Sequence, residues 1–160
     1  TWCRVAMPHD QMDIHDIAVS TDGRVFVCTP PEIYASDTEG PPWRPIGARG
    51  NFAHPYCRGL VMLPGTADSI LVATGDEAVG RTGSIQRTTD GGRHWHAPPL
   101  PATPNSPLWT FAVSSASPGT VLSCSHYGQL WWSEDGGESW VKRERELAQT
   151  RSLALLPGMA

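Results

Sequence analysis

The chain has 160 residues and a formal net charge of −4, which is enough length for one domain with a substantial core. The negative charge removes the electrostatic argument for binding nucleic acid or an anionic membrane, and no apolar run is long enough to predict a membrane-spanning helix. Glycine (16) and proline (15) recur along the whole sequence, which favours many short strands joined by turns over helices.

The four cysteines contain no Cys-x-x-Cys pair, so their spacing indicates no metal centre, and we expect no cofactor. Cys28 and Cys124 lie in apolar, strand-like runs and are expected to be buried free thiols. Unpaired cysteines favour a reducing compartment such as the cytoplasm.

A motif of the form Ser/Thr-x-Asp-x-Gly-x-x-Trp recurs along the chain. It is complete at residues 88–95 and 133–140, a third copy at 36–43 carries Thr38 in place of the aspartate, and Thr1-Trp2 match the end of a further copy. The motif tryptophans are 41, 52 and 45 residues apart, the period of a four-stranded propeller blade. The motif residues with an expected structural role are Ser36, Gly40, Trp43, Thr88, Asp90, Gly92, Trp95, Ser133, Asp135, Gly137 and Trp140.

The motif has the chemistry of a tight turn. An aspartate carboxylate can accept hydrogen bonds from the backbone N–H groups that follow it. The glycine supplies a positive φ, and the tryptophan can pack over the hairpin as the next strand begins. Each copy therefore predicts the connection between the two outer strands of one blade.

The sequence between the motifs predicts the remaining strands. First strands are expected at 14–20, 59–63, 110–115 and 152–156, second strands at 24–29, 69–74 and 120–123, third strands at 33–36, 84–88 and 130–133, and fourth strands at 2–6, 43–46, 95–97 and 140–142. The predicted fold is all-β: about three four-stranded antiparallel blades plus partial strands at both ends, as a fragment or half of a six- to eight-bladed propeller. The expected units are residues 1–8 (last strand of a preceding blade), 14–47, 57–99 and 108–144 (blades), and 151–157 (first strand of a following or closing blade).

Alignment of the predicted first strands places four residues in one column at the channel mouth: His15, Arg58, Trp109 and Arg151. Two arginines there favour an anionic ligand, because guanidinium groups pair with carboxylates. Further candidate ligand-binding residues in nearby loops are His54, Tyr56, His126 and Tyr127, and nearby charged residues are Asp10, Asp13, Asp16, Asp76, Glu77 and Arg81. The alternative is that these residues are solvated or form ion pairs between blades. A metal site from His15, Asp16, His54 and His126 has no diagnostic spacing.

The repeated motif resembles the Asp-box, or BNR repeat, of sialidases and related propellers, and the resemblance covers essentially the whole chain. The family includes sialidases, xyloglucan-active glycoside hydrolases, sortilin-type receptor domains and photosystem II assembly factors. The resemblance implies the fold but not the chemistry. Neither Arg58-Gly59 nor Arg44-Pro45-Ile46 fits the sialidase entry motif, and Arg58 and Arg151 form two members of an arginine triad only if a further blade supplies the third.

Two functions remain open from the sequence. In the first, the propeller is a binding or scaffold module for an anionic or carbohydrate-like ligand. In the second, it is part of a sialidase-like glycoside hydrolase that uses two carboxylates, for which Asp16 and either Asp76 or Glu77 are the candidates. In both, the expected partner is the remainder of a propeller, supplied by the same gene product or by a second copy.

Overall fold

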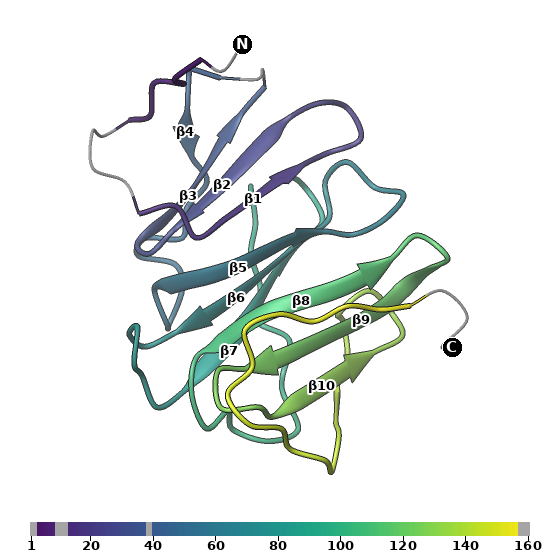
Figure 1. The fold of residues 1–160 in the computed structure, drawn as a ribbon. Coiled ribbons are helices and arrows are strands. Elements are labelled where there is room, and N and C mark those ends of the chain that lie inside the picture. Colours follow the sequence, from purple (N-terminus) through teal and green to yellow (C-terminus); the bar gives the residue numbers. More distant parts are fainter. Residues whose placement is uncertain (1–2, 9–12, 38–39, 157–160) are drawn as a thin grey trace.

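The computed structural model describes residues 3–8, 13–37 and 40–156. These residues form three antiparallel sheets packed side by side, with no helix among them (Figure 1). The described part of the chain therefore holds no helix long and apolar enough to cross a membrane. The all-β prediction is confirmed.

The described residues form eleven strands in these three sheets. The first sheet contains β1 (Asp16–Val19), β2 (Val25–Thr29), β3 (Glu32–Ser36) and β4 (Arg44–Pro45); the middle sheet contains β5 (Tyr56–Met62), β6 (Ile70–Gly75) and β7 (Gly83–Thr88); the last sheet contains β8 (Leu108–Ser114), β9 (Ser117–Ser125), β10 (Leu130–Ser133) and β11 (Val141–Lys142). Each sheet joins strands that are consecutive in the sequence. This is the strand order of propeller blades.

Three of the predicted outer or terminal strands do not form. Residues 3–7 make no strand (Trp2 lies outside the described residues), and the predicted strand 95–97 is reduced to one bridge between His96 and Arg87. Residues 151–156 also make no strand. The predictions of a strand at each end and of a fourth strand in the middle blade were therefore wrong for these residues.

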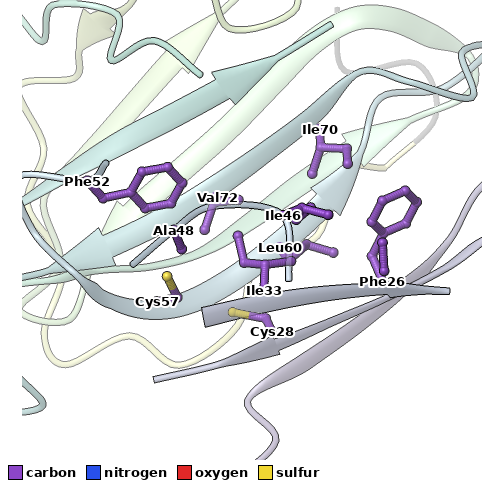
Figure 2. Close-up of a cluster of buried hydrophobic side chains, with 11 residues drawn as sticks. Phe26, Cys28, Ile33, Ile46, Ala48, Phe52, Cys57, Leu60, Ile70 and Val72 are labelled. Carbon is purple, nitrogen blue, oxygen red and sulfur yellow. The ribbon is translucent and has the colours of Figure 1, made fainter. Parts of the chain in front are cut away.

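The middle sheet supplies both hydrophobic cores, because successive side chains of β6 point to opposite faces. Ile70 and Val72 pack against the first sheet in a cluster that includes Phe26 and Ile33 (Figure 2). Leu71 and Ala73 pack on the other side with residues of the last sheet, including the fully buried Trp131. A strand that is buried on both faces has an uninterrupted run of apolar residues in its sequence, as Ile70-Leu71-Val72-Ala73 has here.

The two complete motif copies form the same turn. Asp90 Oδ1 accepts the N–H groups of Arg93 and His94, both at 3.0 Å, and Thr88 Oγ1 accepts the N–H of Gly92 at 3.1 Å. In the second copy, Asp135 Oδ1 accepts the N–H groups of Glu138 and Ser139 at 3.0 Å, and Ser133 Oγ accepts that of Gly137 at 2.8 Å. The expected turn chemistry is present in both.

The motif glycines and tryptophans connect neighbouring sheets. Gly92 has φ +87°, and an added Cβ would meet Ile46 of the preceding sheet at 2.7 Å, so no other residue fits there without displacement. Trp95 is half-buried and donates to the Ile46 carbonyl at 2.9 Å, whereas Trp140 is buried. Thr38 of the third motif copy lies outside the described residues.

Candidate functional site

The candidate site lies at one edge of the sheets, which we call the upper face. It is formed by the β2–β3, β6–β7 and β9–β10 turns and by the chain that enters β5 and β8. Arg58 and Trp109 occupy matching positions near the starts of β5 and β8. Each is the unpaired residue of a β-bulge, an irregularity that redirects a side chain at a sheet edge.

The bulges bring Arg58 and Trp109 into contact. The guanidinium carbon of Arg58 lies 4.3 Å from the centroid of the Trp109 ring, within the range of a cation–π interaction. Gly59 permits this approach, since a Cβ there would meet the Trp109 carbonyl oxygen at 2.8 Å. The close packing of β5 on β8 therefore fixes the position of the arginine.

Two further rings extend this contact. The centroid of the His126 ring is 4.2 Å from that of Trp109 and 5.1 Å from that of Tyr127. The Gln149 amide group reaches His126 Nε2 at 2.8 Å, and the Thr150 N–H donates to the His126 carbonyl at 3.1 Å. These bonds hold the residues just before Arg151 against the β9–β10 turn.

His126 is only 8% exposed, yet its Nδ1 atom has no hydrogen-bond partner within the described chain. Its pKa is lowered by burial and by the positive charges of Arg151 and Arg58. Both guanidinium groups therefore lie close enough to His126 to disfavour its protonated form. In the part of the chain that the structure describes, no carboxylate lies within ion-pairing distance of Arg58 or Arg151.

The remaining candidate ligand-binding residues lie on the first and middle sheets. His15 packs edge-on against Tyr56 with the ring centroids 5.3 Å apart, and its two nitrogens face the Cys57 carbonyl at 2.8 Å and the Asp13 carboxylate at 3.1 Å. Burial raises the pKa of Tyr56. His54 lies apart from these rings and contacts Ser84 Oγ at 3.2 Å.

The three candidate carboxylates differ in their surroundings. Asp16 accepts the N–H groups of Ile17 and Leu60, both at 2.9 Å, and so joins β1 to β5. Partial desolvation acts to raise the pKa of Asp76, but hydrogen bonds from the N–H groups of Arg81 and Thr82 outweigh it and lower the pKa. Glu77 is exposed on the same loop. Asp10 lies outside the described residues.

Sequence reasoning overlooked Gln149 and the prolines at positions 30, 31 and 55, which lie beside the candidate residues on the upper face. The Pro30-Pro31 pair in a second-to-third-strand turn was the available signal. Across the described residues, no three His, Cys, Asp or Glu side chains are grouped closely enough to hold a metal ion.

No protein-family model matches the chain, and no curated protein matches it in sequence. Several solved structures match it in fold. An ancestral GH74 enzyme superposes with a TM-score of 0.64 at 19% identity, over 79% of this chain and 18% of the enzyme. The GH74 xyloglucanase from Xanthomonas campestris gives 0.62 at 18% identity, over 81% of this chain and 21% of the other.

A second group of similar structures consists of YCF48 proteins. YCF48 from Cyanidioschyzon merolae has a TM-score of 0.62 at 18% identity and covers 86% of this chain and 38% of its own. YCF48 bound to D1 peptide gives 0.61 at 16% identity, over 82% of this chain and 40% of the other. The chain thus spans well under half of each of these proteins. At these identities the likeness shows the fold alone, which is that of part of a β-propeller.

Proposed function

We propose that this part-propeller is a binding module whose upper face takes a carboxylate-bearing ligand, carbohydrate or otherwise. Arg58 is the central contact, with Trp109 beneath it and Arg151 and His126 beside it. The observation that carries the proposal is the position of Arg58: its guanidinium lies over an aromatic ring and faces no carboxylate of the described chain. A half-buried, unpaired guanidinium gains most from a carboxylate supplied by a ligand.

Ring stacking supports the same reading. The Trp109 and Tyr127 rings flank His126, so part of the face offers aromatic surface next to positive charge. His126 Nδ1 is buried and lacks a partner within the described chain, and a buried polar atom of this kind gains from a hydrogen-bonding ligand. A ligand with an apolar or sugar body and a carboxylate would satisfy both features.

The experiment compares D-glucuronate with D-glucose, which share a ring and differ in the carboxylate. Binding to the 160-residue chain is followed by calorimetry or by chemical-shift changes. We expect glucuronate to bind more tightly and Arg58→Ala to weaken it about tenfold, the size expected for loss of a charge-assisted hydrogen bond. Glucose binding should change much less.

Arg143→Ala is the matched control, because Arg143 also lies over a tryptophan ring, that of Trp132, at 5.1 Å, but at the outer edge of the last sheet, opposite to β8. It should leave glucuronate binding unchanged. Equal loss of glucuronate and glucose binding in Arg58→Ala would remove the argument for an anionic ligand.

Two observations favour this reading over part of a sialidase-like glycoside hydrolase. Both oxygens of Asp16 accept backbone N–H groups, and the lowered pKa of Asp76 is opposite to what a general acid needs. Full activity of an Asp16→Asn/Glu77→Gln variant on a panel of glycans would rule out a hydrolase mechanism that uses these two carboxylates. Loss of activity in that variant, with folding intact, would favour the hydrolase.

We also propose that further blades complete the propeller, from the same gene product or from a second copy. The two large apolar side chains of β1, Ile17 and Val19, are exposed on the face of the first sheet that no described strand covers. The matched part makes up only 18%, 38% and 21% of the similar solved proteins. Both facts support a partner that packs on this face.

A further inference from the structure

A hollow lies on the upper face between the first and middle sheets. It has a volume of about 470 Å³ and is lined by Pro30, Pro31, Pro55 and Tyr56 and by residues 76–78. The prolines come from the β2–β3 turn and from the chain that enters β5, and the remaining wall comes from the β6–β7 loop. Three connections from two sheets therefore build one concave surface.

The walls of this hollow are apolar and held in place. Proline rings fix the backbone of two of the connections, and the Cys57 N–H donates to the Pro30 carbonyl at 2.8 Å, which ties them together. His15 packs against the edge of Tyr56 at 5.3 Å. A rigid surface of proline and tyrosine rings suits an aliphatic or aromatic group, since little ordering is needed on binding.

The rim on the β6–β7 side is acidic. Asp76 accepts the N–H groups of Arg81 and Thr82, and Gly80 lies so close that an added Cβ would meet Asp76 Oδ1 at 1.8 Å. These contacts hold the Asp76 carboxylate in its ionised form, with a lowered pKa. Neither Asp76 nor Glu77 has a cation within 4 Å among the residues that the structure describes.

We propose that this hollow, lined by Tyr56 and three prolines and rimmed by Asp76 and Glu77, is a binding subsite for a lysine or arginine side chain of a peptide partner. The aliphatic stem lies on the proline and tyrosine rings, and the cationic head pairs with the two carboxylates. An anionic lipid surface is disfavoured by the same carboxylates, and a neutral sugar leaves them unpaired.

The inference builds on the proposed function, because the hollow adjoins the Arg58 site. Tyr56 belongs to the hollow and Arg58 to the neighbouring site, and the two lie on the same strand, β5. Together the two subsites match a peptide that presents a basic side chain and a carboxylate. In this proposal Asp76 and Glu77, which the sequence offered as candidate catalysts, are recognition residues.

The first test uses Nα-acetyl-lysine methylamide, a probe with no carboxylate, so it does not depend on the Arg58 site. Binding to the full 160-residue chain is followed by amide chemical shifts of Tyr56, Glu77 and Ala78. We expect saturable shifts at these residues and roughly three- to fivefold weaker binding of the norleucine analogue, which lacks the ammonium group, as befits an exposed charge pair.

Two variants locate the charge recognition. Glu77→Gln should reduce the lysine–norleucine difference, and Asp76→Asn/Glu77→Gln should abolish it. Glu77→Gln is the safer variant, because none of the described hydrogen bonds uses the Glu77 side chain, whereas Asp76 organises its loop. Glu144→Gln is the matched control, because Glu144 is an exposed carboxylate in the segment that follows the last sheet. This variant should bind the probe like the unaltered chain.

The outcomes separate this inference from the proposed function. Arg58→Ala should leave binding of the lysine probe unchanged. If glucuronate does not bind but the lysine probe does, only the proposed anion site is overturned. Equal binding of the lysine and norleucine probes, or shifts confined to other residues, would overturn the cationic subsite. If n-pentylamine, which has no peptide backbone, bound as tightly as the lysine probe, the hollow would recognise a free amine. That result would overturn the assignment of a peptide partner.

Discussion

Asp16 and Leu60 link the first sheet to the middle sheet: the Asp16 carboxylate accepts the Leu60 N–H at 2.9 Å. Leu60 is 5% exposed, so its N–H has little access to water if the carboxylate is removed. Asp16→Ala should therefore lower the free energy of unfolding by about 1–3 kcal/mol, the cost of an unsatisfied buried donor. Urea denaturation measures the change.

Glu144→Ala removes an exposed carboxylate and should leave the stability within about 0.5 kcal/mol of the original. If Asp16→Ala were as stable as the original chain, the link between β1 and β5 would not contribute to folding. A catalytic role for Asp16 would then regain support.

The Asp135 turn should make stability depend on pH in the acid range. Partial desolvation raises the pKa of Asp135, but hydrogen bonds from Ser139 and neighbouring groups outweigh it and lower the pKa to about 2. Because the unfolded value is about 3.9, the ionised carboxylate stabilises the fold above about pH 4, and this contribution is lost as pH falls toward about 2.

Asp135→Ala should consequently be less stable than the original chain at pH 7 by about 1 kcal/mol, a modest figure because the residue is exposed and its charge is screened. The difference should disappear near pH 2. Denaturation curves at pH 7, 4 and 2 test this, and a difference independent of pH would assign the effect to something other than the ionised carboxylate. Ligand binding at the upper face should be unaffected at pH 7.

The cysteines should differ sharply in reactivity. Cys3 is exposed, whereas Cys28, Cys57 and Cys124 are buried. Figure 2 shows Cys28 and Cys57 on facing strands. A hydrogen bond with Cys57, together with burial, raises the pKa of the Cys28 thiol, and burial raises that of Cys124 to about 12. Since the thiolate is the reactive form, iodoacetamide at pH 8 should alkylate Cys3 alone.

Mass spectrometry after digestion identifies the labelled residues. In concentrated urea all four cysteines should react, which provides the control for reagent and time. Rapid labelling of Cys28 in the folded chain would mean that the first and middle sheets separate readily.

The repeated motif allowed the sheets to be predicted from the sequence. Features that depend on contacts between residues far apart in the sequence could not be predicted in this way. Pro118 and Gly119 fall between the strands predicted at 110–115 and 120–123, yet both residues belong to β9. Gly119 is needed there because a Cβ would meet the Glu134 carbonyl oxygen at 2.6 Å, and its own carbonyl accepts the Gly136 N–H. A glycine required by a neighbouring turn and one required by its own turn look alike in sequence.

The candidate site could also be predicted only in part from the sequence. Strand alignment placed Arg58 and Trp109 in one column, and these two are in contact. It could not indicate that Gln149 holds His126, or that the prolines meet Tyr56, because these contacts join segments far apart in the sequence. That His15, Arg58, Trp109 and Arg151 all lie at one channel mouth stays a prediction.

The outer face of the first sheet should drive association. Ile17 and Val19 of β1 are 56% and 61% exposed, and Ile14 beside them is 42% exposed. In the middle sheet, by contrast, the apolar residues of the central strand β6 are buried on both faces by the neighbouring sheets. Burial of apolar surface contributes about 25 cal/mol per Å², so a face of several side chains favours a partner blade or a second copy.

Light scattering at increasing concentration should show association of the 160-residue chain, with binding of a hydrophobic dye that falls as association proceeds. Ile17→Lys should shift the chain toward monomer, because a charged side chain on this face opposes burial. Val79→Lys is the matched control: Val79 is 76% exposed but lies on the β6–β7 loop, away from β1, so it should associate as before. A chain that stays monomeric at high concentration and binds no dye would show that this face needs no cover, and the proposal of further blades packed on it would fall.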